Sequence, residues 1–196
     1  MVQGNEDTLR LFKTNTRYML SGRPFKLYGY QNAVGYDINN PSWEDRDRLI
    51  LSIGHTAPVL YASLAEAGFF QKDECMTLRK IGSRLQGHPS KDSELPGVET
   101  SAGSLGQGLG IAIGMALSAK MDDKNYRTYC VMGDGELQEG SVWEAAMAAS
   151  NYRLDNLCAI IDRNRLQIDG STESVMALEP LDEKWTSFGW NVVEID

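Results

Sequence analysis

Residues 126–135 decide the fold of this chain; they read Tyr-Arg-Thr-Tyr-Cys-Val-Met-Gly-Asp-Gly. The largely apolar run Tyr126–Met132 predicts a buried strand, because such runs suit a sheet that is covered on both faces. Gly133-Asp134-Gly135 ends this strand, and its glycines allow the backbone to approach a ligand closely. We therefore expect the Asp134 carboxylate to lie at the carboxyl end of a central strand.

A second predicted strand ends in a matching polar residue. Leu157–Asp162 (LCAIID) is apolar and β-branched, and Arg163 and Asn164 follow it. In a parallel sheet ligands bind beyond the carboxyl ends of the strands, so Asp134 and Asn164 are expected to lie close together. A carboxylate oxygen and an amide oxygen suit Mg²⁺, which completes its octahedron with phosphate oxygens and water.

The rest of the chain predicts strands that alternate with helices. Helices are expected over residues 57–68, 72–85, 105–120, 141–151 and, in part, 174–188, and further strands over 49–52 and 191–195. This alternation is typical of an α/β fold with a parallel sheet flanked by helices. The helix over 105–120 is expected to be buried, with glycines for close packing. In the helix over 141–151, Trp143, Met147 and Ser150 share a face that is interpreted as packing. Leu9–Phe12 and Tyr18–Leu20 are candidates for short helical pieces.

Composition narrows the class of protein. The formal net charge is −8, with 42% hydrophobic and 23% charged residues, which is ordinary for a globular protein and offers no basic patch for nucleic acid or an anionic membrane. An anionic ligand would therefore need a metal ion or oriented backbone N–H groups. Cys75, Cys130 and Cys158 show no CxxC spacing and are interpreted as reduced thiols of a cytoplasmic protein. No apolar run reaches the roughly 18 residues of a membrane span.

Six ordered blocks of the sequence resemble the transketolase family over about residues 36–196. They are Ser52–His55 (SIGH), Gly87–Pro89 (GHP), Gly103–Gly108 (GSLGQG), Gly133–Gly140 (GDGELQEG), Leu154–Leu157 (LDNL) and Asp162–Gly170 (DRNRLQIDG). The resemblance implies a thiamine-diphosphate-binding fold that is partial and truncated at both ends. It implies an atypical segment over residues 1–35 and a transketolase-type diphosphate-binding domain over 36–196, incomplete at its C-terminus. The implied activity is transfer of a two-carbon ketol unit between sugar phosphates.

The resemblance also assigns metal and diphosphate ligands. Asp134, Asn164 and the backbone carbonyl of Leu166 would bind Mg²⁺, or Ca²⁺ or Mn²⁺ in its place, and the metal would hold the diphosphate of thiamine diphosphate. Gly135 and the imidazole of His55 would approach the same diphosphate, and Asn164 would contribute to the cofactor site as well as to the metal.

Further roles follow from the same resemblance. Gly103, Ser104 and Leu105 would line the thiazolium and pyrimidine region, and His88 would face the reacting carbon and donate hydrogen bonds to the sugar phosphate. Glu139 and Glu144 match acids that lie at the family's subunit interface and help to link two active sites.

A partner is implied because the family takes the glutamate that contacts the aminopyrimidine ring from a separate pyrimidine-binding domain. That domain, or a C-terminal transketolase subunit, would complete a dimer or heterotetramer. Two departures favour low activity of the chain alone. Residues 1–31 contain no histidine to match the family's Gly-His-Pro-Gly-Gly-Ser motif, and the sequence ends at Asp196, before a further active-site histidine.

Several alternatives remain open on the sequence alone. The chain is compatible with a catalytically silent relative, or with another enzyme of this cofactor class such as deoxyxylulose-phosphate synthase or a 2-oxoacid dehydrogenase component, although Leu85–Pro89 and Gly103–Gly108 favour transketolase. A dinucleotide loop over Gly103–Gly110 is disfavoured because the GxGxxG spacing is missing. At the level of single residues, Asp134 is compatible with a simple turn and the two histidines with structural roles. Glu136, Glu139 and Glu144 are compatible with a solvated helix entry.

Overall fold

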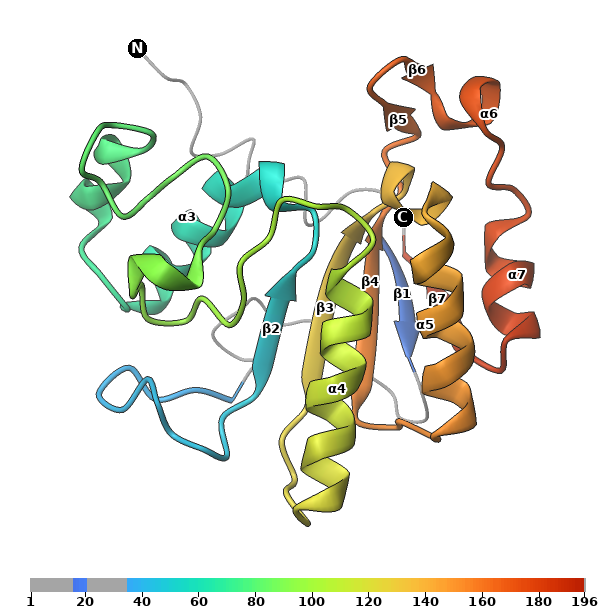
Figure 1. Cartoon of the computed structure of the whole chain (residues 1–196), viewed down its shortest axis with the longest axis horizontal. Helices are drawn as coiled ribbons and strands as arrows, with labels where there is room; N and C mark the ends of the chain where they lie inside the picture. The colour runs from blue at the N-terminus through green and yellow to red at the C-terminus, as the bar shows by residue number, and fades with distance from the viewer. Residues whose placement is uncertain (1–15, 21–34, 196) are drawn as a thin grey trace.

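A five-stranded sheet forms the centre of the molecule (Figure 1). The computed structural model describes residues 16–20 and 35–195. In spatial order the strands are β2 (Arg48–Leu51), β3 (Thr128–Gly133), β4 (Leu157–Asp162), β1 (Thr16–Leu20) and β7 (Asn191–Glu194). β2, β3 and β4 run parallel, and Gly133 lies beside Asp162 in the register. The predicted parallel core is confirmed, and its two polar strand ends are neighbours.

β1 departs from the prediction. Tyr18–Leu20, a candidate helical piece, lies in this strand, so the helical interpretation was wrong. The strand runs antiparallel to both neighbours, with Thr16 beside Asp162 and Tyr18 beside Val193, which makes the sheet mixed at this side. Five residues with Thr, Tyr and Met are too few to nucleate a stable helix, whereas pairing with two strands satisfies their backbone groups. Leu9–Phe12 lies outside the described residues.

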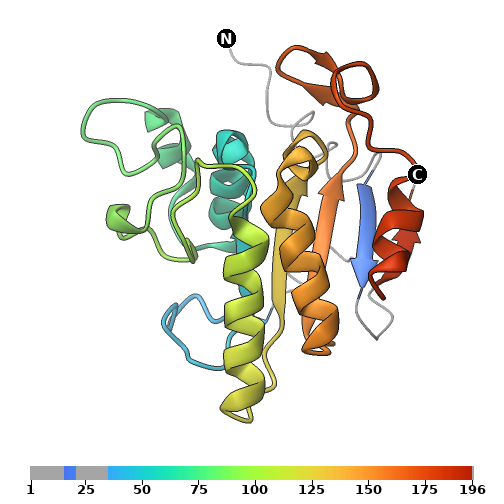
Figure 2. The ribbon, with the colours of Figure 1, turned by 45° about the vertical axis from the view of Figure 1, so that its right-hand side comes forward.

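Helices cover both faces of the sheet. α4 (Gly108–Met121), α5 (Gly140–Asn151) and α7 (Leu181–Ser187) lie side by side over one face (Figure 2). α3 (Ala57–Ala67) packs on the opposite face. Successive strand residues point to opposite faces, so each strand contributes to two cores. Cys130, Met132, Ala159 and Ile161 pack under α4, α5 and α7, whereas Tyr129, Val131, Cys158 and Ile160 pack with α3.

Short elements connect these strands and helices. They are the 3₁₀ helices η1 (Gly54–Thr56), η2 (Lys72–Thr77), η3 (Lys91–Ser93) and η4 (Gly135–Gln138), the hairpin β5 (Leu166–Gln167) and β6 (Gly170–Ser171), and α6 (Thr172–Val175). The helix predicted over 72–85 was wrong beyond η2. Arg79 and Gly82 have φ values of 60° and 81°, which a right-handed helix excludes. Gly68, with φ of 93°, ends α3 as predicted.

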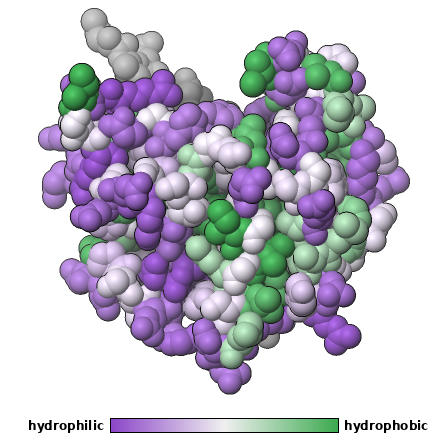
Figure 3. All heavy atoms as spheres, viewed as in Figure 1, coloured by the Kyte–Doolittle hydropathy of each residue, from purple (hydrophilic) through white to green (hydrophobic). Residues whose placement is uncertain are grey.

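Two expectations about burial, one for α4 and one for α5, were wrong in part. α4 was expected to be buried, but Gly110, Ile111 and Gly114 are exposed, and a Cβ at either glycine would meet no atom of the described residues within 4 Å beyond its chain neighbours and the backbone of α4 itself. In α5 Trp143 packs against the core while Met147 is 50% exposed, so the predicted packing face is only partly buried. Figure 3 shows apolar residues gathered over these helices. Among the described residues, no helix combines the length and apolar character that crossing a bilayer requires.

Candidate functional site

Asp134 lies where the sequence predicts, at the carboxyl end of β3, and its carboxylate is almost fully enclosed. The side chain is 1% exposed. Its Oδ2 accepts hydrogen bonds from Nη1 of Arg163 and from the backbone N–H of Arg165, both at 2.6 Å. Oδ1 accepts from the N–H of Gly135 at 2.8 Å. The loop after β4 is therefore fastened directly to the Asp134 carboxylate.

The other expected metal ligands lie on that loop. Asn164 and Leu166 are exposed, and Oδ1 of Asn164 accepts from the N–H of Leu166 at 2.8 Å. The carbonyl oxygen of Leu166 lies 3.4 Å from the position that a Cβ on Gly135 would take. A side chain at 135 would thus fill the space between the Gly133–Gly135 turn and this carbonyl.

The available oxygen donors fit Mg²⁺. Asp134, Asn164 and the Leu166 carbonyl offer one carboxylate, one amide and one backbone oxygen, the hard ligands that Mg²⁺ takes together with phosphate oxygens. The described residues contain no cluster of three or more His, Cys, Asp or Glu side chains that could hold a metal. The candidate set has a single carboxylate and leaves the remaining positions to a ligand's phosphates and to water.

The two histidines approach the glycine-rich loop Gly103–Gly108 from different segments. A Cβ on Gly54 would lie 2.8 Å from both the carbonyl carbon of Ala102 and the nitrogen of Gly103, so the turn that carries His55 touches this loop. A Cβ on Gly103 would lie 3.8 Å from the imidazole of His88. Both imidazoles are exposed at this edge. In Figure 3 the edge is hollowed between the β5–β6 hairpin and the region of α3.

Glu136 is a site residue that the sequence analysis missed. It was interpreted only as compatible with a solvated helix entry, whereas its side chain is buried. It is 2% exposed. Its carboxylate accepts from the Ser52 hydroxyl, from the Gly106 N–H at 2.8 Å and from the Gly133 N–H at 3.3 Å. Burial raises the pKa of Glu136, and these hydrogen bonds together with the charge of His55 oppose the rise. Glu136 therefore ties the ends of β2 and β3 to the glycine-rich loop.

The same loop reaches the start of α5. A Cβ on Gly106, whose φ is 83°, would lie 2.8 Å from Cβ of Glu139, and the Ser141 hydroxyl donates to the Gly106 carbonyl at 3.0 Å. Ser104 is exposed and Leu105 partly buried. Glu139 and Glu144 are exposed, so the solvated interpretation holds for these two acids in the isolated chain.

Arg163 is the second residue that sequence analysis missed as part of the site. It is 4% exposed and forms ion pairs with Asp134, Glu173 and Glu179. Burial lowers its pKa, but the hydrogen bonds to Asp134 and Glu179 outweigh this and raise it. The sequence signal that could have identified it was its place directly after a buried strand and next to Asp162. Next to it, burial, helped by the charge of Asp134, raises the pKa of Asp162.

Comparison with curated proteins shows that the chain is similar to transketolases. The chain is 51% identical over 169 residues to an apulose-4-phosphate transketolase subunit from Phocaeicola vulgatus, covering 84% of this chain and 59% of that protein. It is 46% identical over 167 residues to the 6-deoxy-6-sulfo-D-fructose transketolase subunit SqwG of Clostridium sp. (strain MSTE9), covering 85% and 60%. Human transketolase is 48% identical over 166 residues, covering 84% and 26%. The chain thus spans less than two thirds of these relatives.

Solved structures give the same result. Transketolase from Leishmania mexicana superposes with a TM-score of 0.74 at 34% identity, covering 82% of this chain and 25% of that one. A Pichia stipitis transketolase in complex with sedoheptulose 7-phosphate gives 0.71 at 33% identity, covering 81% and 25%. The family model "Transketolase, thiamine diphosphate binding domain" matches residues 24–196. The chain therefore belongs to the transketolase family and carries the family's thiamine-diphosphate-binding domain.

Proposed function

We propose that this chain is the diphosphate-binding part of a transketolase that moves a two-carbon ketol unit between sugar phosphates. The main support is that the Asp134 carboxylate accepts a hydrogen bond from the loop that bears Asn164 and Leu166. Gly135 leaves open space between Asp134 and the Leu166 carbonyl. This arrangement offers oxygen ligands and open backbone space at one sheet edge, as a metal-bound diphosphate requires.

The chain's residues divide the work in this proposal. Asp134, Asn164 and the Leu166 carbonyl hold Mg²⁺, while Gly135 and His55 approach the diphosphate. Thiamine diphosphate, when bound, supplies the nucleophilic carbon, and the protein supplies orientation and electrostatics. Gly103, Ser104 and Leu105 line the ring side of the site. His88, exposed beside Gly103, donates hydrogen bonds to the sugar phosphate.

We further propose that a pyrimidine-binding domain on a partner chain covers the exposed face of α4 and α5. Ile111, Met121 and Met147 are 37%, 76% and 50% exposed there. Glu139, just before α5, and Glu144, in its second turn, are also exposed. Two relatives are named as subunits, and both are matched over about 60% of their length. A partner on this face would bury the apolar side chains and place its aminopyrimidine-contacting glutamate opposite the glycine-rich loop.

The test is the melting temperature of the full chain with Mg²⁺ and thiamine diphosphate together. A ligand that binds only the native state stabilises it by about 2.7 kcal/mol at a hundredfold excess over its Kd, which for a chain of this size is a rise of roughly 5–10 °C. Asp134→Ala should abolish the rise, whereas Asp169→Ala, an exposed aspartate on the neighbouring hairpin, should keep it.

The comparison uses the ligand-induced shift of each variant, because Asp134→Ala also leaves Arg163 without a buried partner and lowers the starting temperature. If the unaltered chain shows no shift, alone or with a transketolase C-terminal subunit, the cofactor-binding proposal is wrong. A shift without ketol transfer in the reconstituted complex would instead favour a catalytically silent relative.

A further inference from the structure

Arg163 lies between the expected metal ligand and the segment that follows the β5–β6 hairpin. Nη1 donates to Oδ2 of Asp134 at 2.6 Å and to Oγ1 of Thr172 at 2.7 Å. Nη2 donates to Oε1 of Glu173 at 2.7 Å and to Oε1 of Glu179 at 3.0 Å. A guanidinium buried to 4% exposure thus uses its planar fork to join two parts of the chain.

The hydrogen bonds around Asp134 distinguish its two oxygens. Each carboxylate oxygen has about two acceptor positions. Oδ2 uses both, toward Arg163 and the Arg165 N–H, while among the described residues Oδ1 accepts only from the Gly135 N–H. One position on Oδ1 is therefore left for a cation. Arg163 fixes which oxygen that is.

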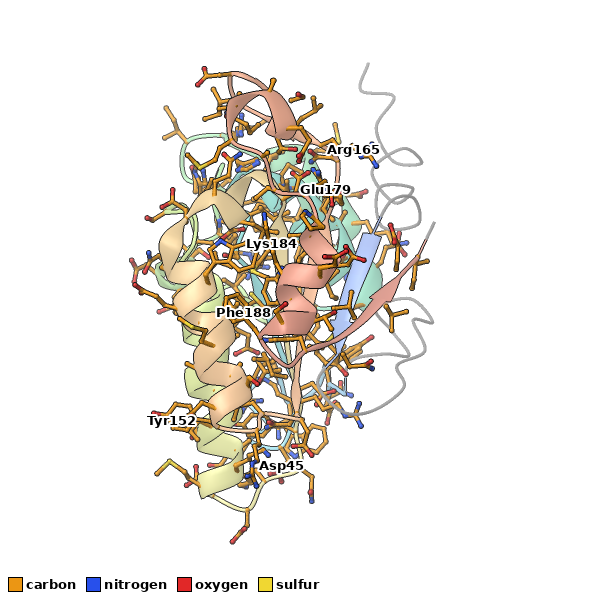
Figure 4. The ribbon with its side chains drawn as sticks, turned by 90° about the vertical axis from the view of Figure 1, so that its right-hand side faces the viewer. Asp45, Tyr152, Arg165, Glu179, Lys184 and Phe188 are labelled. Atoms are coloured by element: carbon orange, nitrogen blue, oxygen red, sulfur yellow. The ribbon has the colours of Figure 1, made fainter. Side chains whose placement is uncertain are left out.

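The opposite side of the guanidinium binds the segment 172–179, which leads into α7. Oε1 of Glu173 also accepts from the Leu178 N–H at 3.1 Å, and Oε2 of Glu179 accepts from the Leu181 N–H at 2.9 Å. Arg163 thereby closes this segment onto the end of β4. Figure 4 shows Glu179, which precedes α7, at the same end of the molecule as Arg165.

We propose that Arg163 is a positioning residue: it occupies Oδ2 of Asp134 so that Oδ1 faces the metal, and it holds the 172–179 segment beside the site. This inference rests on the proposed function. It is not the outcome that charge alone would give, because a cation next to a metal ligand repels Mg²⁺ and its removal would tighten metal binding. The fork geometry, and not the charge, is what positioning requires.

The experiment measures Mn²⁺ binding to the full chain in the presence of thiamine diphosphate, from the electron paramagnetic resonance signal of free Mn²⁺. Arg163→Lys keeps the charge but loses the fork, and Arg163→Met loses both. Positioning predicts that each variant binds Mn²⁺ about tenfold or more weakly. Glu173→Gln is the matched control: it keeps an acceptor oxygen for Arg163 and leaves the contact between Arg163 and Asp134 in place, so it should change the Kd by less than about twofold.

Each result decides the matter. Wild-type affinity in Arg163→Lys, or tighter binding in Arg163→Met, overturns the inference. If Arg163→Met does not fold, the lysine variant decides alone. A purely structural role would lower the melting temperature of the metal-free variants and leave the Kd of the folded protein unchanged. Failure of the unaltered chain to bind Mn²⁺ would count against the proposed function itself, and is therefore distinguishable.

Discussion

The two halves of the candidate site are held together by different physical means. On the diphosphate side, the turn with Asp134 and the loop with Asn164 are joined by a buried ion pair. On the histidine side, the glycine-rich loop is held by close backbone approach, as at Gly54, and by N–H groups that donate to Glu136. The first half depends on compensating charge, and the second depends on the absence of side-chain volume at its glycines and on the acceptor oxygens of Glu136.

This difference predicts different sensitivities. A buried ion pair is destabilising to break, because the remaining charge stays buried without its partner. A close contact at glycine fails when any side chain is added, whatever its polarity. Added volume should therefore have its largest effect on the histidine side, where loss of an acceptor at Glu136 has a smaller one, and breaking a charge pair should act on the diphosphate side.

The largest effect is expected from adding one methyl group at Gly108. A Cβ there would lie 2.4 Å from Cβ and Oγ of Ser52 and 2.9 Å from its Cα, so backbone must move. Gly108→Ala should lower the free energy of unfolding by about 3 kcal/mol, as overpacking does. Urea denaturation measures this change.

Gly110→Ala is the matched control in the same helix. Apart from the backbone of α4 itself and the two chain neighbours, no atom of the described residues lies within 4 Å of its added Cβ, and replacing glycine by alanine in a helix gains up to about 1 kcal/mol. Equal effects at 108 and 110 would show that close approach does not hold this half of the site.

A smaller loss is expected from Glu136→Gln, which keeps the volume and removes the charge. The carboxylate accepts from three donors, and an amide would turn its NH₂ group toward at least one of them. A buried donor left unpaired costs about 1–3 kcal/mol, and relief of the buried charge offsets part of it, so we expect about 1–2 kcal/mol.

Glu139→Gln, three residues later and exposed, should stay within about 0.5 kcal/mol of the unaltered chain in the same urea titration. If Glu136→Gln were as mild as this control, then acceptor groups would not matter on the histidine side, and volume alone would hold it.

The smallest effect concerns an ion pair that is partly exposed to solvent. Arg84 donates to both oxygens of Glu74 at 2.5 and 2.9 Å, and this hydrogen bonding lowers the pKa of Glu74 below its ordinary value of 4.5. Solvent screens the pair, so Glu74→Gln should cost only about 0.5 kcal/mol at pH 7. A lowered folded-state pKa gives stability that is present above pH 4.5 and is lost as the pH falls through the folded value.

Stability measured from pH 7 to pH 2 should therefore show the variant and the unaltered chain converging at the acid end. A difference that persists below the folded pKa would mean that the Glu74 side chain acts through packing. A much larger loss at pH 7 would erase the contrast between this partly exposed pair and the buried pair of Arg163 and Asp134.

The sequence was sufficient where a local pattern determines the structure. The strand Leu157–Asp162 was predicted to the residue, and Gly68 ends α3 because a left-handed residue is needed there. The nearness of Asp134 to the loop after β4 follows from parallel strands ending at one sheet edge.

The rest depends on partners that are distant in sequence. Glu136 is buried because Ser52, 84 residues away, and Gly106, 30 residues away, donate to it. β1 is a strand because β4 and β7 flank it, and its five residues carry too little pattern to show this. Charged residues are expected at the surface unless they are paired, and pairing is a property of the folded chain.

The aromatic cluster under α5 and α7 gives the protein a built-in optical probe. Three of its four tryptophans lie together: the ring centroids of Trp143 and Trp185 are 5.5 Å apart, and those of Trp185 and Trp190 are 5.0 Å apart. Trp185 is fully buried, while Trp43, the fourth, is 39% exposed. Intrinsic emission will therefore be dominated by the α5–α7 layer, which the 172–179 segment joins to Arg163. Its wavelength will report whether that layer stays packed when the site changes.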